Sequence, residues 1–373
     1  MTNVYCREEM SLTEKEKEVF ADYLKQQELS LNIWDVFNEW VVRSTPKVKF
    51  IYLKVFQNDE LIGLGLFIKI KPFDMRTSYS ALRKYALLSK LFSVISTLSN
   101  DCVYISFRNL ITSNITRPFF YRTPEMESTT MKAILTYLKE KKEADMVSVL
   151  DTSINDGHYE MAGFNKFPSS SEAWLDVPKY QNVSEYLNEH RNLKRNLKRS
   201  KSDIEKVIQH GPISDIDKGQ MKDCVDCSVR ESKINTPTQK FFEDNIFETE
   251  VFNSGKYIHV CIRVDKVIAG FHIFHVSGSI MGGVLGGFNR KYSKNNFVYE
   301  RVIVASLDYA IKNKISRVHY SVIDNYTKLR LVDSLEPCGL YFYSSNPLNR
   351  NVFKATFKYS DLYNLYLLEK EGL

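Results

Sequence analysis

The chain has 373 residues, of which 43% are hydrophobic, so it is long enough for two domains that each bury a core. Its 51 Lys and Arg residues outnumber its 45 Asp and Glu residues only slightly, which gives a formal charge of +6. That mild excess argues against a dedicated nucleic-acid-binding protein, and it requires any anion-binding site to be local.

The amino-terminal stretch MTNVYCREEMSLTEKEKE has neither the apolar core nor the small-residue cleavage site of a signal peptide. No run of eighteen apolar residues occurs, so no membrane-spanning helix is predicted. Six dispersed cysteines do not form a secreted disulfide framework, and the CxxC of Cys224 and Cys227 is interpreted as helix packing. We therefore expect a cytoplasmic protein without a metal ion, with peripheral membrane association as an alternative.

Two segments share one pattern, KFIYLKVFQNDELIGLGLFI at 49–68 and KYIHVCIRVDKVIAGFHIF at 256–274. Each predicts a strand, a polar turn and a second strand entered through a glycine, Gly63 or Gly270, which is a β-hairpin. A helical pattern and then a buried strand follow each hairpin, at 131–144 and 145–151 in the first half and at 300–314 and 317–324 in the second. This repetition predicts an α/β protein with two similar domains.

The first copy is longer because it carries an insertion at about residues 72–100. Within the insertion, 80–98 is apolar with its cations on one side. We favour a helix packed on its own domain, and the alternative is a helix that lies in a membrane interface or caps an acyl-binding cleft. We place the domain boundary near Pro178, which divides the chain into 1–178 and 179–373.

The stretch RNLKRNLKRSK at 191–201 has six cationic side chains and no acidic one. At helical pitch, one side of the segment is cationic and the other is apolar. The cationic side carries Arg191, Lys194, Arg195, Lys198 and Arg199, and the apolar side carries Leu193, Leu197, Ile204 and Ile208. The pattern predicts an amphipathic helix that faces phosphate, nucleic acid or lipid head groups, or else a solvated face with no ligand.

The repeated order of elements, this basic segment and the run RKYSKNNFVYERVIVASLDYAIKNKISRVHYSVIDNYTKLRL resemble the tandem acyltransferases of the GNAT superfamily, in particular the FemAB-like branch. That branch includes peptidoglycan cross-bridge aminoacyltransferases and related acyl-CoA N-acyltransferases. The likeness extends from about residue 48 to residue 358. It implies two tandem GNAT-like domains, each a mixed, mainly antiparallel twisted sheet flanked by helices. It also implies an active site in 179–373, with 1–178 as a degenerate copy.

The segment SGSIMGGVLGGF at 277–288 predicts a strand whose glycines mark a bulge or a close approach of a ligand to the backbone, or merely close packing of strands. The resemblance implies that this strand, with Gly282, Gly283 and Gly286, is splayed from its neighbour and pairs with the acyl donor. The expected loop at 289–296 carries Arg290, Lys291 and Lys294 but none of the glycines usual in GNAT enzymes. These cations, with the amide end of the helix that begins near Phe297, are expected to hold the phosphates of acyl-CoA.

Amide formation from a thioester requires a proton acceptor, stabilisation of an oxyanion and assistance to the leaving group. Lys328 matches a lysine that FemAB-like sequences carry, and it is expected to stabilise the oxyanion or a donor phosphate. Ser321 stands where a glycine is usual in these sequences. Tyr326 matches a tyrosine that protonates the leaving thiolate in GNAT enzymes. His319, or Asp324 beside it, is the candidate proton acceptor. The alternatives are a solvated lysine, an unrelated tyrosine and a structural histidine.

The sequence therefore favours an N-acyltransferase that transfers an acyl group from an acyl-CoA-like thioester to a primary amine, with a small-molecule or lipidic acceptor. A first alternative keeps the fold but takes its acyl group from aminoacyl-tRNA, whose phosphates would contact 191–201. A second alternative is a non-catalytic module that binds an anionic membrane surface.

Overall fold

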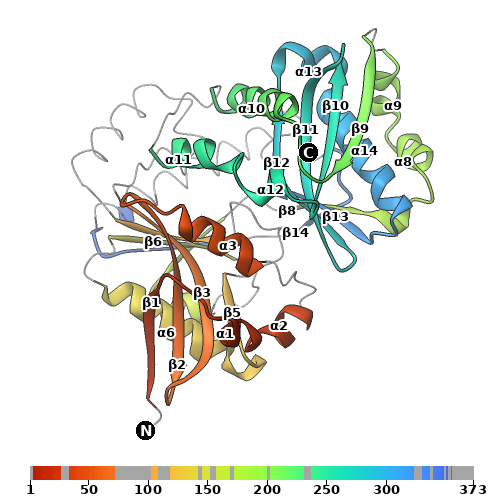
Figure 1. The fold of residues 1–373 in the computed structure, drawn as a ribbon. Helices are drawn as coiled ribbons and strands as arrows, with labels where there is room; N and C mark the ends of the chain where they lie inside the picture. Colours follow the sequence, from red (N-terminus) through yellow and green to blue (C-terminus); the bar gives the residue numbers. More distant parts are fainter. Residues whose placement is uncertain are drawn as a thin grey trace.

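The computed structural model describes most of the chain, and its two sheets lie side by side (Figure 1). The described residues are 3–26, 33–71, 102–107, 118–141, 145–151, 157–168, 172–199, 202–230, 237–322, 330–336, 339–347, 350–351 and 354. The expected insertion helix at 80–98 lies outside them. Among the described helices, none has the length and apolar character needed to cross a membrane.

The first sheet has eight strands in the order β1-β2-β3-β4-β6-β15-β7, with β5 paired to β3. The strands are β1 (Val4–Glu9), β2 (Val48–Gln57), β3 (Glu60–Ile70), β4 (Val103–Ser106), β5 (Phe119–Tyr121), β6 (Met146–Asp151), β7 (Asn165–Pro168) and β15 (Gly339–Ser344). The helices of this half are α1 (Glu14–Glu18), α2 (Ala21–Gln26), α3 (Ile33–Val42), the 3-10 helix η3 (Pro124–Met126), α6 (Glu127–Glu140) and α7 (Gly157–Met161).

The second sheet has seven strands in the order β14-β8-β13-β12-β11-β10-β9. The strands are β8 (Glu172–Asp176), β9 (Ile204–His210), β10 (Tyr257–Val264), β11 (Val267–Ser277), β12 (Ile280–Phe288), β13 (Arg317–Val322) and β14 (Ser334–Glu336). The helices are η4 (Val177–Lys179), α8 (Val183–Glu189), α9 (Arg191–Leu197), α10 (Asp215–Arg230), α11 (Pro237–Ile246), α12 (Glu250–Asn253), α13 (Arg290–Asn296) and α14 (Val298–Lys312).

Both sheets are mainly antiparallel and follow the same order, so the expected α/β architecture with two similar halves is confirmed. In each sheet one pair of neighbours is parallel, β4 with β6 and β12 with β13. The parallel partner follows a long helix, α6 in the first half and α14 in the second. The chain therefore builds the same strand-helix-strand crossover twice.

The two predicted hairpins are confirmed, and they match in detail. Each has a two-residue turn whose residues take positive φ, Asn58 and Asp59 in the first and Asp265 and Lys266 in the second. Each has a shift in register shortly after the turn. A side chain at Gly63 would collide with Thr130 of α6, and one at Gly270 would collide with Val298 of α14. The glycine in each copy therefore lets the crossover helix lie close against the hairpin.

The two sheets exchange one strand each. Strand β8 precedes the expected boundary at residue 178, yet it pairs with β13 and β14 of the second sheet. Strand β15 follows all the other strands in sequence, yet it pairs with β6 and β7 of the first sheet. The division into 1–178 and 179–373 remains a prediction about domains, but the residues of each sheet are not confined to one side of it.

The halves also share a hydrophobic core. One cluster of buried residues includes Trp40 of α3 and Phe50 of β2 together with Phe241 of α11 and Phe271 of β11. The ring centroids of Trp40 and Phe242 are 5.2 Å apart, and those of Phe50 and Phe241 are 6.2 Å apart. Two further clusters are confined to one half each, around α14 and around α6. Helix α11 therefore packs on the first half through aromatic side chains.

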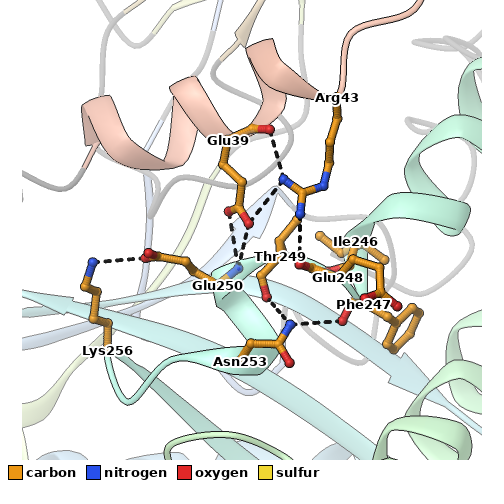
Figure 2. Close-up of polar contacts among 9 residues, drawn as sticks. All are labelled: Glu39, Arg43, Ile246, Phe247, Glu248, Thr249, Glu250, Asn253 and Lys256. Carbon is orange, nitrogen blue, oxygen red and sulfur yellow. Dashed lines mark hydrogen bonds and ion pairs between the residues drawn. The ribbon is translucent and has the colours of Figure 1, made fainter.

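A polar clamp joins Glu39 and Arg43 to the backbone at Glu248 and Glu250, as Figure 2 shows. The carboxylate of Glu39 accepts hydrogen bonds of 3.0 and 3.2 Å from the backbone N–H of Glu250, at the first turn of α12. Arg43, the residue after α3, donates a hydrogen bond of 2.9 Å to the carbonyl oxygen of Glu248. Thr249, the residue before α12, provides no side-chain cap. The first half therefore supplies the cap of a helix in the second half.

The expected amphipathic helix is shorter than its sequence pattern predicts. Helix α9 ends at Leu197, and the expectation that Ile204 and Ile208 continue its apolar side is wrong, because both lie in β9. There they pair with Val264 and Val260 of β10. β-branched residues suit a strand at the edge of a sheet, and these backbone pairs outweigh the helical spacing of the side chains.

Candidate functional site

Strands β12 and β13 pair only where they begin. The paired residues are Ile280 with Arg317, Met281 with Val318 and Gly282 with His319. Strand β12 continues to Phe288 and β13 to Val322, but within the described residues their pairing ends at Gly282 and His319. Among the described residues, β12 therefore extends past its last pair with β13 as far as Phe288. The two strands thus diverge as the resemblance implied, but only beyond Gly282, which the resemblance had placed in the splayed part and which pairs with His319.

The glycines of β12 have two different structural settings. A β-carbon at Gly283 would lie 2.5 Å from Nε2 of His272 and 3.0 Å from the carbonyl oxygen of His319. One at Gly287 would lie 2.9 Å from the backbone nitrogen of Val225 in α10. Close helix packing therefore accounts for Gly287, whereas Gly283 lets the side chain of His272 and the backbone of His319 approach β12 closely.

The predicted bulge in β12 is also present. The pairing with β11 shifts between Ile273 and Phe274, whose partners are Leu285 and Gly283, so Val284 has no partner of its own on β11. A bulge increases the local twist and bends the strand that carries it. It falls just beyond the last pair with β13, at Gly282, so it contributes to the divergence of the two strands.

The expected loop at 289–296 is a short helix, α13, so the prediction of a loop is wrong. The side chain of Asn289 caps it by accepting a hydrogen bond from the backbone N–H of Lys291. Phe297 then takes a left-handed conformation, with φ 52°, and α14 begins at Val298. Arg290 and Lys291 lie in the first turn of α13. Lys294 also lies in this helix, but its side chain is outside the described structure.

The end of α9 and the start of α14 meet at one guanidinium group. Arg301 donates a hydrogen bond of 2.8 Å to the carbonyl oxygen of Asn296 and another of 2.6 Å to that of Leu197. Glu300 lies in the first turn of α14, where burial raises the pKa of its carboxyl group. This arrangement holds the basic helix next to the amide end of α14.

The cations of α9 are exposed, except for Lys194, which is half-buried. Lys194 donates a hydrogen bond to Asn188, and Arg195 donates one to Asn192. No ion pair joins Arg191, Lys194, Arg195, Lys198 or Arg199 to an acidic residue within the described part of the chain. Within the described residues, the charge of these five side chains of α9 and the two residues after it is therefore not balanced by an ion pair, which favours an anionic ligand.

His319 is buried, with 1% of its surface exposed, and it lies between two strands. Its backbone pairs with Gly282 of β12 on one side and Trp174 of β8 on the other. Its Nε2 is 3.6 Å from Oε2 of Glu172, which is also buried. The rings of His319 and Trp174 have centroids 4.5 Å apart. These contacts place the histidine at the point where β12 and β13 part.

Glu172 and Trp174 were missed by the sequence analysis because they precede the expected boundary near Pro178. The stretch EAWLD has the length and composition of a strand, and this signal could have been found. Its pairing with β13 joins residues far apart in sequence, which a local pattern does not reveal. Two further histidines, His272 and His275, lie on β11. The ring centroid of His272 lies 6.0 Å from that of Tyr320. Burial lowers the pKa of His275.

The remaining predicted site residues lie outside the described structure. These are Tyr326 and Lys328, together with the alternative proton acceptor Asp324. Of Ser321, only the backbone is described, within β13. The roles assigned to these side chains therefore remain predictions.

The corresponding place in the first sheet has different contacts among the described residues. Strands β4 and β6 pair at three positions, after which β4 ends at Ser106. The hydroxyl oxygen of Ser106 accepts a hydrogen bond of 3.0 Å from the backbone N–H of Leu150 in β6. Beside it, Phe119 and Tyr159 are buried, with ring centroids 6.3 Å apart.

No protein-family model matches the sequence, and no curated protein matches it. Solved structures do match in fold, each with a TM-score of 0.53. FemX is 10% identical, over 93% of this chain and 99% of that one. A tandem GNAT protein from the clavulanic acid biosynthesis pathway is 11% identical, over 93% of this chain and 99% of that one. L-PGS from Bacillus licheniformis is 10% identical, over 92% of this chain and 95% of that one. The chain therefore has the FemAB-like tandem GNAT fold.

Proposed function

We propose that the protein is an N-acyltransferase that transfers an acyl group from an acyl-CoA-like thioester to a primary amine. The observation that carries this proposal is the parting of β12 and β13 after Gly282 and His319. A thioester laid along the uncovered edge of β12 can accept hydrogen bonds from backbone amides, as a further strand would. The fold shared with a solved tandem GNAT protein supports the same reading.

The cations around the α13–α14 corner are assigned to the phosphates of the donor. Arg290, Lys291 and Lys294 lie on α13, and the first backbone N–H groups of α14 follow directly. A helix amino terminus favours anions because its first N–H groups have no partner within the helix. The end of α9, tied to this corner through Arg301, adds Lys198 beside it. Phosphates would thus be bound by charge from three helices.

The reaction begins when the ammonium group of the acceptor loses a proton to water and becomes a neutral amine. Its lone pair attacks the carbonyl carbon, a nitrogen–carbon bond forms, and negative charge moves to the oxygen, where the amides of β12 and Lys328 stabilise it. The nitrogen gives up a second proton to His319. The carbon–sulfur bond then breaks with its electron pair on sulfur, which takes a proton from Tyr326. The products are an amide and a free thiol.

A second candidate function takes the acyl group from aminoacyl-tRNA. The unneutralised cations of α9 favour it, because a row of exposed Arg and Lys side chains suits a phosphate backbone. Such binding should weaken steeply between about 50 and 200 mM salt. A third, non-catalytic function would use the same cations on an anionic membrane surface.

Thermal unfolding with separate ligands tests the proposal. Coenzyme A at about 100 times its dissociation constant should stabilise the protein by about 2.7 kcal/mol and raise Tm by about 3–4 °C. Adenosine, which lacks phosphate, is the matched control and should leave Tm unchanged. Retention of tRNA at low salt without a response to coenzyme A would favour the second function. Binding to anionic vesicles with no response to either ligand would favour the third.

A further inference from the structure

Two ionisable side chains face each other inside the second sheet. Glu172 of β8 and His319 of β13 are 4% and 1% exposed, and their nearest oxygen and nitrogen are 3.6 Å apart. Burial of a carboxylate is costly unless a charge or hydrogen bonds compensate it. A histidine facing that carboxylate gains a proton more readily, because the opposite charge favours the imidazolium form.

The surroundings of this pair fix its geometry. Trp174 lies next to His319 in the sheet. The guanidinium group of Arg317 lies over the ring of Trp174, 4.1 Å from the ring centroid. Arg317 is bound by two acids, Asp176 at 3.1 Å and Glu336 at 2.8 Å. Among the described residues, the charged groups on this face include Glu172, Arg317 and the two acids that hold Arg317. The carboxylate of Glu172 lies 3.6 Å from Nε2 of the imidazole.

We infer that Glu172 is a positioning residue for His319, and that it stabilises the imidazolium formed when His319 takes the proton of the attacking amine. The inference rests on the proposed function. The proton moves from the nitrogen of the tetrahedral intermediate to the imidazole, and Glu172 stays ionised as the counter-charge. In a site with little water, a counter-charge at this distance stabilises the transition state without reorganisation.

The exchange of strands brings these two side chains together. Glu172 lies on β8, before the expected boundary, whereas His319 lies on β13 of the second half. The exchanged strand thus delivers a carboxylate from the first half of the chain to the site in the second. Under this arrangement the pairing of β8 with β13 completes the proton acceptor.

Histidine-selective isotope labelling and a pH titration of the ring signals by NMR test the inference without any substrate. The signal of His319 is assigned by its loss in His319→Gln. In Glu172→Gln, which keeps the shape and removes the charge, the His319 signal should titrate at a pH lower by about one unit or more. Glu172→Asp, which keeps the charge, should move the midpoint less and serves if the first variant does not fold. Glu336→Gln, on the strand beside β8, is the matched control and should shift the midpoint by less than half as much.

The rate of acetyl transfer from acetyl-CoA to a panel of primary amines gives a second readout. In Glu172→Gln, kcat should fall by about tenfold or more with little change in KM, and the rise of the rate with pH should begin at lower pH. A His319 signal that titrates alike in the wild type and in Glu172→Gln overturns the inference. If the NMR shift is observed but no amine is acetylated by the wild type, the pairing stands and the proposed acyl transfer fails.

Discussion

Arg301, in the first turns of α14, donates a hydrogen bond of 2.6 Å to the carbonyl oxygen of Leu197, the last residue of α9. This bond fixes the basic helix at the amide end of α14. Anions attracted by α9 are therefore delivered to the corner at which donor phosphates are expected.

Reversal of charge on α9 should impair donor capture without unfolding the protein. In the double variant Arg195→Glu, Lys198→Glu, we expect affinity for coenzyme A to fall by roughly tenfold, because two exposed cations become anions beside the phosphate site. Both side chains are exposed, so the free energy of unfolding should change by about 0.5 kcal/mol or less per site. Calorimetric titration measures the affinity. Lys222→Glu, an exposed position on α10, is the control, and an equal loss of affinity there would refute the local role of α9.

A side chain at Gly283 should obstruct the site. In Gly283→Ala the new methyl group would meet the imidazole of His272 and the carbonyl oxygen of His319, so one of these groups must move. We expect a loss of about 1–3 kcal/mol in stability and a clear loss of coenzyme A binding. Gly219→Ala is the matched control, since a β-carbon at Gly219 meets nothing within 4 Å. Its position inside α10 predicts a gain of up to about 1 kcal/mol. Denaturant unfolding and ligand titration of both variants decide the point.

The polar clamp between the halves should contribute measurably to stability. Glu39→Gln removes the charge that caps α12, and Arg43→Ala leaves the carbonyl oxygen of Glu248 without this donor. Each change should cost about 1–2 kcal/mol, because hydrogen bonds to charged groups exceed neutral ones in strength. Since α3 and α12 belong to different halves, the double variant should also loosen α11. Hydrogen exchange at 237–246 measures that loosening, and unchanged exchange there would show that the aromatic contacts alone hold α11.

The buried histidine of β10 predicts a loss of stability in acid. Burial lowers the pKa of His259 from 6.5 to about 4, so the unfolded chain binds its proton more tightly than the folded protein does. The contribution is complete above pH 6.5 and declines as pH falls towards 4. Between pH 7 and pH 4.5 this one group should cost about 2–3 kcal/mol.

Denaturant unfolding at the two pH values measures that loss. His259→Gln should show a smaller loss between them than the wild type. His210→Gln, at an exposed position on the neighbouring strand, should behave like the wild type. An identical pH dependence in all three proteins would contradict the assignment to His259.

The repeated architecture could be predicted from sequence because its signals are local. The turn at Asn58 and Asp59, the glycine at Gly63 and the apolar spacing of α14 each depend on a few neighbouring residues. The exchange of β8 and β15 could not, because strand pairing joins residues more than a hundred positions apart. The start of β9 was also missed, since Ile204 satisfies both a helical and a strand pattern, and only its pairing with Val264 decides between them.

The candidate site was predictable in part for the same reason. The glycines of β12 and the cations near 290 stand out in the sequence itself. Glu172 does not, because its importance comes from a partner brought to it by the sheet. The loop expected at 289–296 became a helix because the side chain of Asn289 caps the backbone N–H of Lys291 and no glycine interrupts the segment.

The central claim is that a phosphate-bearing donor lies along the uncovered edge of β12 with its phosphates at the start of α14. Hydrogen exchange with and without coenzyme A tests this claim most directly. Amides at 283–288 and 298–300 should exchange at least about tenfold more slowly with the ligand, while those at 103–106 and 146–151 in the first sheet stay unchanged. Protection confined to the first sheet, or equal exchange at 283–288 in both states at saturating ligand, would contradict it.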